Sequence, residues 1–64
     1  MQKIESSKKY QNGLQVFWSG AEGDSNDFFT YDELIDQRIN VLDLLNNPAI
    51  YRIDPDTHRI ESSV

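Results

Sequence analysis

Apolar and polar residues alternate most clearly in the first third of the chain. Leu14, Val16 and Trp18 alternate with Gln15 and Phe17. This period of two is typical of a strand that places one face on a core. The segment therefore predicts a half-buried β-strand.

The Asn12-Gly13 pair before this segment predicts a β-hairpin, because a type I′ turn needs a positive φ at both central positions and these residue types tolerate it. We expect residues 4–10 and 14–19 to form the two strands. The first is rich in Ser and Lys and has the composition of a weak edge strand. Residues 20–27 combine two glycines with Asp, Ser and Asn, whose side chains compete for backbone hydrogen bonds, and predict a loop.

The strongest helix signal follows this predicted loop. Thr30 and Glu33 have the spacing of a capping box, in which the Thr30 hydroxyl accepts from the Glu33 amide and the Glu33 carboxylate accepts from the Thr30 amide. A helix should therefore begin at Tyr31. Phe29 and Leu34 can pack together across the cap as a hydrophobic staple.

Residues 31–45 have the periodicity of a single amphipathic helix. The helix should end at Asn46-Asn47-Pro48, because the residue before a proline is disfavoured in the α region and Asn tolerates the left-handed turn at a helix end. One face of this helix is polar and the other apolar. The apolar arc holds Tyr31, Leu34, Ile35, Ile39, Val41, Leu42 and Leu45, and the opposite arc holds Asp32, Asp36, Asn40 and Asp43.

The last third of the chain predicts two short strands. Residues 49–53 have β-branched and aromatic content, residues 54–57 form a turn around Pro55, and residues 58–61 return as a strand. The order is β-β-α-β-β. It predicts the α+β class, with a small antiparallel sheet of three to four strands packed on one amphipathic helix.

Length and composition predict one small domain over residues 1–64. A chain of 64 residues has room for one thin core, and its apolar fraction of 38% supplies enough material for it. The chain has no cysteine, so we expect neither a disulfide framework nor a thiolate zinc site. The N-terminal residues do not resemble a signal peptide, and no membrane span is visible. We therefore expect a cytoplasmic protein.

Charge is concentrated in the middle of the chain. Residues 22–43 hold seven acidic residues and one basic residue, whereas the formal charge of the whole chain is −5. A concentrated negative field repels nucleic acid and anionic lipid and attracts basic surfaces. The sequence therefore predicts no direct nucleic-acid partner, no membrane partner, and a protein partner with a basic surface.

Two patterns suggest chemistry of another kind. Glu22, Asp24, Asn26 and Glu33 occupy liganding positions of a twelve-residue calcium loop, although Asp27 stands where the sharp turn requires glycine. An incidental acidic loop is the simpler interpretation, and weak cation binding stays open as an alternative. The only histidine, His58, has no cysteine to share a zinc site and should lie on the surface beside a turn. No nucleophile stands beside an oriented base, so we expect no catalytic residue, no metal site and no cofactor.

The acidic helix face is the leading functional candidate. Asp32, Asp36 and Asp43 would project at intervals similar to phosphates along a nucleic-acid strand, so this face could occupy a groove built for DNA or RNA. A solvated face that only keeps the helix soluble is the plain alternative. Arg38 interrupts the apolar arc, where it either extends its charge to a carboxylate or a carbonyl or pairs across an interface. Of the adjacent aromatics Phe28 and Phe29, we expect Phe28 to be the exposed one, because neighbouring side chains of an extended segment point to opposite faces.

These observations favour a non-enzymatic protein-binding module, in the manner of an inhibitor or accessory subunit, that mimics nucleic acid toward a basic partner surface. A structural homodimer with an apolar helix or sheet-edge interface is the main alternative, and the cation-binding loop is the second. The expected partner-binding residues are Asp24, Asp27, Phe28, Asp32, Asp36, Arg38 and Asp43.

Overall fold

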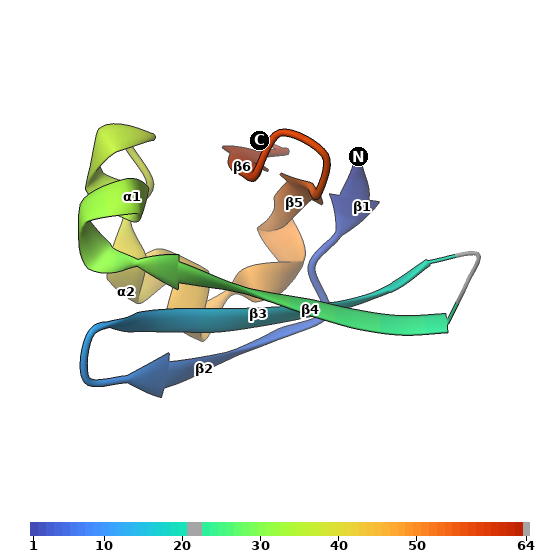
Figure 1. The fold of residues 1–64 in the computed structure, drawn as a ribbon, viewed down its shortest axis with the longest axis horizontal. Helices are drawn as coiled ribbons and strands as arrows, with labels where there is room; N and C mark the ends of the chain where they lie inside the picture. Colours follow the sequence, from blue (N-terminus) through green and yellow to red (C-terminus); the bar gives the residue numbers. More distant parts are fainter. Residues whose placement is uncertain (21–22, 64) are drawn as a thin grey trace.

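The computed structural model describes residues 1–20 and 23–63, which form two three-stranded antiparallel sheets and two short α-helices (Figure 1). The α+β class is confirmed. The expected single sheet on one helix, in the order β-β-α-β-β, is wrong. The elements are β1 (Gln2–Lys3), β2 (Ser6–Tyr10), β3 (Gly13–Gly20), β4 (Gly23–Thr30), α1 (Tyr31–Asp36), α2 (Val41–Asn46), the 3-10 helix η1 (Pro48–Ile50), β5 (Tyr51–Asp54) and β6 (Arg59–Ser62).

The predicted hairpin is confirmed, with its turn one residue earlier than expected. Tyr10 pairs with Gly13, so the turn residues are Gln11 and Asn12, and neither has a positive φ. Gly13 instead lies in β3, where a Cβ atom would collide with the carbonyl oxygen of Phe29. The glycine is therefore needed for close approach of β4, and a type I′ turn does not form. β2 is an edge strand, as its composition predicts.

The segment predicted as a loop over residues 20–27 is mostly strand. β4 pairs with β3 along its whole length, from Gly13 opposite Thr30 to Gly20 opposite Gly23. Its polar side chains find partners on the neighbouring strand: Gln15 Nε2 donates to Asn26 Oδ1 at 2.6 Å, and Ser19 Oγ donates to Asp24 Oδ1 at 2.9 Å. Cross-strand partners thus replace the backbone hydrogen bonds that such side chains make in loops.

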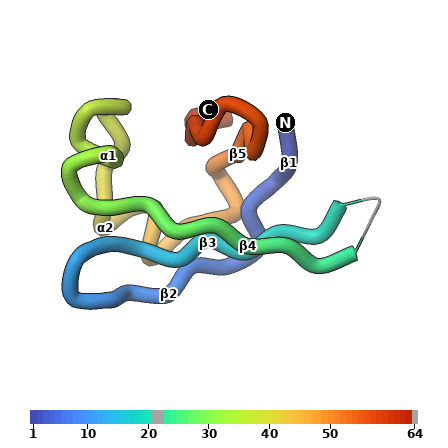
Figure 2. The backbone as a smooth tube through the Cα atoms, viewed as in Figure 1, coloured from blue at the N-terminus to red at the C-terminus, as the bar shows by residue number. Residues whose placement is uncertain are grey.

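The chain passes from one sheet to the other just before β2, and Figure 2 shows the bend between β1 and β2. The amide of Ile4 donates to Tyr51 in β5, and the next amide, Glu5, donates to Phe17 in β3. The expected strand over residues 4–10 is therefore shorter, and β1 belongs to the second sheet, in the order β1-β5-β6.

The helix predicted over residues 31–45 is broken into α1 and α2. The capping box at Thr30 is confirmed. After Asp36, Arg38 adopts φ 60°, its amide donates to Ile35 at 2.9 Å, and the amide of Ile39 donates to Leu34 at 2.9 Å. These two bonds form a Schellman motif, which ends a helix.

A second cap starts the next helix. The side chain of Asn40 accepts from the Asp43 amide at 3.0 Å, so Asn40 is the N-cap of α2. The helix then ends before Pro48, as predicted. The predicted apolar arc is not one surface, because Leu34 and Leu44 are buried while Ile35 and Leu42 are 63% and 67% exposed.

The core lies between the two sheets and the helices (Figure 1). Leu14, Val16 and Trp18 point inward from β3, which confirms the period of two, and Phe29 joins them from β4. The remaining core side chains come from the N-terminal segment, both helices and the second sheet: Ile4, Leu34, Leu44, Tyr51, Ile53 and Ile60. In the part of the chain that the structure describes, no helix has the length and apolar character needed to cross a bilayer.

Candidate functional site

The structure does not gather the predicted acidic residues into one face. Asp32 and Asp36 are exposed on α1, while Asp43 lies on α2 behind the helix break. Asp24 and Asp27 alternate along β4, so they point to opposite faces of the sheet. The continuous helix that was expected to align these carboxylates is absent because Arg38 and Asn40 interrupt it.

Asp43 has a structural partner. Its Oδ2 accepts from the Tyr51 hydroxyl at 2.7 Å, and its Oδ1 accepts from Asn47 Nδ2 at 3.1 Å. Burial and the neighbouring Asp43 carboxylate raise the pKa of Tyr51 to about 12. Asp43 thus joins α2 to β5.

Asp27 and Glu33 meet at His58, which sequence reasoning placed on the surface beside a turn. His58 Nδ1 lies 2.8 Å from Asp27 Oδ2, and Nε2 lies 2.6 Å from Glu33 Oε2. The imidazole ring stacks on Phe29, with ring centroids 3.9 Å apart and an interplanar angle of 11°. We call Asp27, His58 and Glu33 the His58 bridge.

A neutral imidazole has one N–H, so both contacts of the His58 bridge act as hydrogen bonds only when His58 is an imidazolium. The pKa of Glu33 is lowered, chiefly because the Thr30 amide donates to its carboxylate; burial opposes the shift, and the Thr30 hydroxyl and His58 add to it. Both ring nitrogens face carboxylates, so neither is directed at a substrate. The arrangement links β4, α1 and the turn before β6.

The turn that carries His58 is also held by hydrogen bonds between its backbone and the Gln37 side chain. Gln37, the C-cap of α1, donates through Nε2 to the His58 carbonyl at 3.0 Å and accepts from the Ile60 amide through Oε1 at 2.7 Å. His58 itself has φ 55°, a conformation that costs about 1–2 kcal/mol for a residue other than glycine. The contacts of its ring and carbonyl compensate for that cost.

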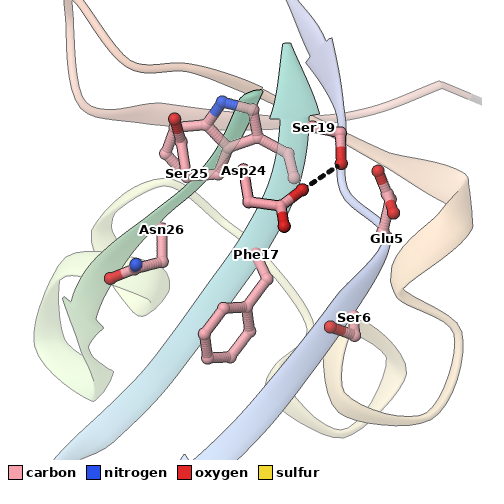
Figure 3. Close-up of a pocket in the computed structure, with 8 residues that line it drawn as sticks. Glu5, Ser6, Phe17, Ser19, Asp24, Ser25 and Asn26 are labelled. Carbon is pink, nitrogen blue, oxygen red and sulfur yellow. Dashed lines mark hydrogen bonds between the residues drawn. The ribbon is translucent and has the colours of Figure 1, made fainter. Parts of the chain in front are cut away.

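A groove opens on the opposite, outer face of the β2-β3-β4 sheet (Figure 3). Phe17 alternates with the buried Val16 and Trp18, and it lies opposite Ser6 on one side and Asn26 on the other. Figure 3 shows Phe17 between these two side chains, with Glu5, Ser19 and Asp24 toward one end. The groove has a volume of about 270 Å³, and we call it the sheet groove; it is lined by Glu5, Ser6, Phe17, Trp18, Ser19, Asp24, Ser25 and Asn26.

The sheet groove carries two carboxylates, Glu5 and Asp24, and no basic residue. Both acidic side chains are exposed, and within residues 1–20 and 23–63 neither makes an ion pair. Hydroxyl and amide groups supply further hydrogen-bond acceptors. The groove therefore combines an aromatic surface with negative charge that the described residues do not neutralise.

Two further predicted contact residues lie outside the sheet groove. Phe28 is on the same outer face and packs edge-on against Tyr10, with ring centroids 6.2 Å apart, while Lys8 lies 5.5 Å from the centre of the Tyr10 ring. Arg38 is exposed at the helix break. Of the predicted set, only Asp24 lines the groove.

Sequence reasoning missed Glu5, Phe17 and the pairing of Glu33 with His58. The alternation along β3 placed Phe17 opposite the core-facing side chains, which was the available signal for an outer-face aromatic. Nothing local links residues 27 and 58. The calcium pattern begins at Glu22, which lies outside the described residues, and the described residues include no group of three or more His, Asp or Glu arranged to hold a metal ion.

Comparisons with known protein families, with curated proteins and with solved structures find no match to this chain.

Proposed function

We propose that this chain is a non-enzymatic protein-binding module that receives a cationic side chain of a basic partner in the sheet groove. The observation that carries this proposal is the Phe17 ring in a groove lined by the carboxylates of Glu5 and Asp24, with no basic residue among its lining. The proposal keeps the basic partner expected from the charge of the chain. The proposed contact lies on the outer face of the sheet, whereas the sequence favoured the acidic face of the helix.

The chemistry of the groove matches an arginine or lysine side chain. A guanidinium or ammonium group is attracted to the face of an aromatic ring, and it forms its strongest hydrogen bonds with carboxylates. The polar groups of Ser6, Ser19 and Asn26 can accept remaining donors. A ligand with one positive charge would offset part of the negative charge of the groove.

The size of the groove favours one side chain over a whole metabolite. Its volume of about 270 Å³ is below the range of about 300–1,000 Å³ that is usual for small-molecule sites. It is open on the sheet face, where a partner surface could cover it (Figure 3). The net charge of −5 would accelerate encounter with a basic partner and make binding sensitive to salt.

Trp18, the only tryptophan of the chain, lies on β3 between the groove residues Phe17 and Ser19, so its emission can report binding although its indole points into the core. The probe is the capped peptide acetyl-Gly-Arg-Gly-amide, titrated while tryptophan emission is recorded. We expect a saturable change that weakens as salt rises from about 50 to 500 mM. The same peptide with citrulline, which is neutral, should produce no saturable change.

Matched variants separate groove binding from general attraction. Asp24→Asn and Glu5→Gln should each weaken the arginine peptide about tenfold, because each removes one charge-assisted hydrogen bond. Asp32→Asn and Asp36→Asn remove the same charge from α1 and should leave affinity nearly unchanged. Equal losses in all four variants would show that the peptide responds only to net charge, which would overturn the proposal.

A further inference from the structure

The free edge of β4 borders the sheet groove. β4 is the last strand of the β2-β3-β4 sheet, and within the described residues β3 is its only strand partner. The amides of Phe28 and Thr30 donate to carboxylate side chains, at 2.9 and 3.3 Å, so these two residues direct their backbone groups away from β3. Backbone direction alternates along a strand. Asp24 and Asn26 therefore direct their backbone groups to the same free edge.

The edge is open at Asp24 and Asn26. Within residues 1–20 and 23–63, no side chain and no backbone group outside the strand pairing accepts from these two amides. Both residues are exposed. Unpaired backbone groups on a strand edge are a template for another strand. This part of the edge is therefore available for pairing.

The same two residues line the sheet groove. Alternate side chains of one strand share a face, so Asp24 and Asn26 project to the outer face with Phe17 (Figure 3). A strand added at this edge would place two of its residues opposite Asp24 and Asn26, with their side chains on that outer face. Long side chains reach diagonal neighbours across a strand pair. A basic side chain opposite Asn26 would therefore reach the Asp24 carboxylate and the side of the groove that holds Phe17.

We propose that the partner segment is a short, extended, basic strand, which pairs antiparallel with β4 at Asp24 and Asn26 and places two alternating arginine or lysine side chains over the sheet groove. This inference rests on the proposed function and defines the form of its partner. Charge selects the occupant: the groove holds the carboxylates of Glu5 and Asp24 without a basic lining residue, and the chain has a net charge of −5. Main-chain hydrogen bonds would supply affinity, and the alternate side chains would supply specificity.

The closed end of the edge limits the length of the pairing. Asp27 Oδ1 accepts from the Phe28 amide, and Asp27 Oδ2 contacts His58. A partner residue opposite Phe28 would find that donor already used, and α1 begins soon afterwards at Tyr31. The paired part of the partner should therefore be confined to the positions opposite Asp24 and Asn26 and the residue between them.

The probe is the capped peptide acetyl-Thr-Arg-Thr-Arg-Thr-amide, titrated into the unmodified, nitrogen-15-labelled chain beside acetyl-Gly-Arg-Gly-amide. We expect the pentapeptide to bind about tenfold more tightly than the tripeptide. In its complex, the amides of Asp24 and Asn26 should exchange with solvent more slowly than in the free chain, because they donate to the added strand. The tripeptide, which is too short to pair at both positions, should leave these two exchange rates nearly unchanged.

Two methylated pentapeptides are the matched controls, since they keep every charge and side chain. N-methylation of both arginines removes the donors to the carbonyls of Asp24 and Asn26 and should abolish the gain in affinity. N-methylation of the second and third threonines, whose amides point away from β4 in this pairing, should preserve it. Equal affinities for the two methylated peptides would overturn the pairing of the partner with the strand edge.

Failure of the groove itself gives a different result. A pentapeptide with citrulline in place of both arginines should bind at least about tenfold more weakly. A citrulline peptide that binds as tightly as the arginine form would overturn both the basic character of the strand and the proposed function. If the tripeptide binds in the groove but the pentapeptide gains no affinity and protects neither edge amide, only the strand pairing is overturned.

Discussion

The sheet groove and the His58 bridge use the same residue types for opposite purposes. Each has two carboxylates beside a phenylalanine ring: Glu5 and Asp24 beside Phe17, and Asp27 and Glu33 beside Phe29. In the bridge an imidazole lies on the ring and contacts both carboxylates. In the groove that place is open. The carboxylates of the bridge already have a partner within the fold, whereas those of the groove face no imidazole and no basic side chain.

Alternation along β4 separates the two regions. Asp24 and Asp27 are three residues apart, and an odd separation on a strand places side chains on opposite faces. Asp24 reaches the outer face and the groove, whereas Asp27 reaches the side of the core and the bridge. Two acids that look equivalent in the sequence therefore have different roles.

The largest expected effect on the free energy of unfolding comes from replacing Phe29 with alanine. The same replacement at Phe17 is the comparison. Phe29→Ala removes a fully buried ring and the surface on which His58 stacks. It should cost about 3–5 kcal/mol, comparable with the total stability of so small a domain. Phe17→Ala should cost only about 1 kcal/mol, because its ring is half-buried on the outer face.

Chemical denaturation followed by circular dichroism measures the loss of unfolding free energy in both variants. Titration with the arginine peptide tests whether Phe17 also contributes to binding in the groove. Phe17→Ala should stay folded and lose most of its affinity for the peptide. A Phe17→Ala variant that binds as well as the unmodified chain would contradict the assignment of Phe17 to the groove.

The carboxylate of Asp43 adds a third case, which can be tested at alkaline pH. Tyr51 pairs with Asp43, and its pKa is raised from 10.0 to about 12 in the folded chain. A raised pKa means that the neutral phenol is favoured by folding, so this stability is fully present below pH 10 and is lost as pH rises to about 12. The loss should be roughly 2–3 kcal/mol. In a plot of unfolding free energy against pH, Tyr51→Phe should remove this alkaline loss. A variant that shows the same loss as the unmodified chain would contradict its assignment to Tyr51.

The sequence predicted the parts of this picture that depend on neighbouring residues. The capping box at Thr30, the alternation of Leu14, Val16 and Trp18, and the end of the helical segment before Pro48 are local patterns, and the structure confirms them. The helix break was less visible. Its Schellman motif uses Arg38 where glycine is usual, so the only local signals were the misplaced Arg38 and the capping residue Asn40.

The groove and the bridge could not be predicted in the same way. The groove residues are brought together by sheet pairing, and the bridge residues by a contact between the two sheets. Asp27 and His58 are 31 positions apart. The groove depends on β4 being a strand. Its composition predicted a loop, because the cross-strand donors to Asp24 and Asn26 cannot be seen in a single segment. With β4 assigned to a loop, the opposite directions of Asp24 and Asp27 could not be recognised.

Arg38 and His58, the two residues other than glycine with positive φ among those the structure describes, allow the contribution of the bridge to stability to be measured. Arg38→Gly should stabilise the chain by about 0.5–1 kcal/mol, because it relieves the left-handed conformation without removing a buried contact. His58→Gly gains the same relief and loses two carboxylate contacts and a ring stack. It should therefore be less stable than Arg38→Gly by about 1–3 kcal/mol. Equal stabilities in thermal unfolding would show that the bridge contributes nothing.

The smallest expected effect is on the acid side. The pKa of Glu33 is lowered from 4.5, so its ionised form is favoured by folding, and this stability is present above pH 4.5 and is lost as pH falls through the folded pKa. Its side chain is 40% exposed, so the contribution should be below about 1 kcal/mol. Glu33→Gln should flatten the stability curve in this range, whereas Asp32→Asn, on the solvent side of α1, should leave it unchanged.

Amide shift mapping tests the division between groove and bridge most directly. Nitrogen-15-labelled protein would be titrated with acetyl-Gly-Arg-Gly-amide, and the shift of each backbone amide recorded. Binding in the groove predicts saturable changes at Glu5, Ser6, Phe17, Ser19, Asp24 and Asn26. It predicts little change at Asp27, Glu33 and His58. Changes centred on the bridge or on Asp32 and Asp36, with the groove residues silent, would contradict the account.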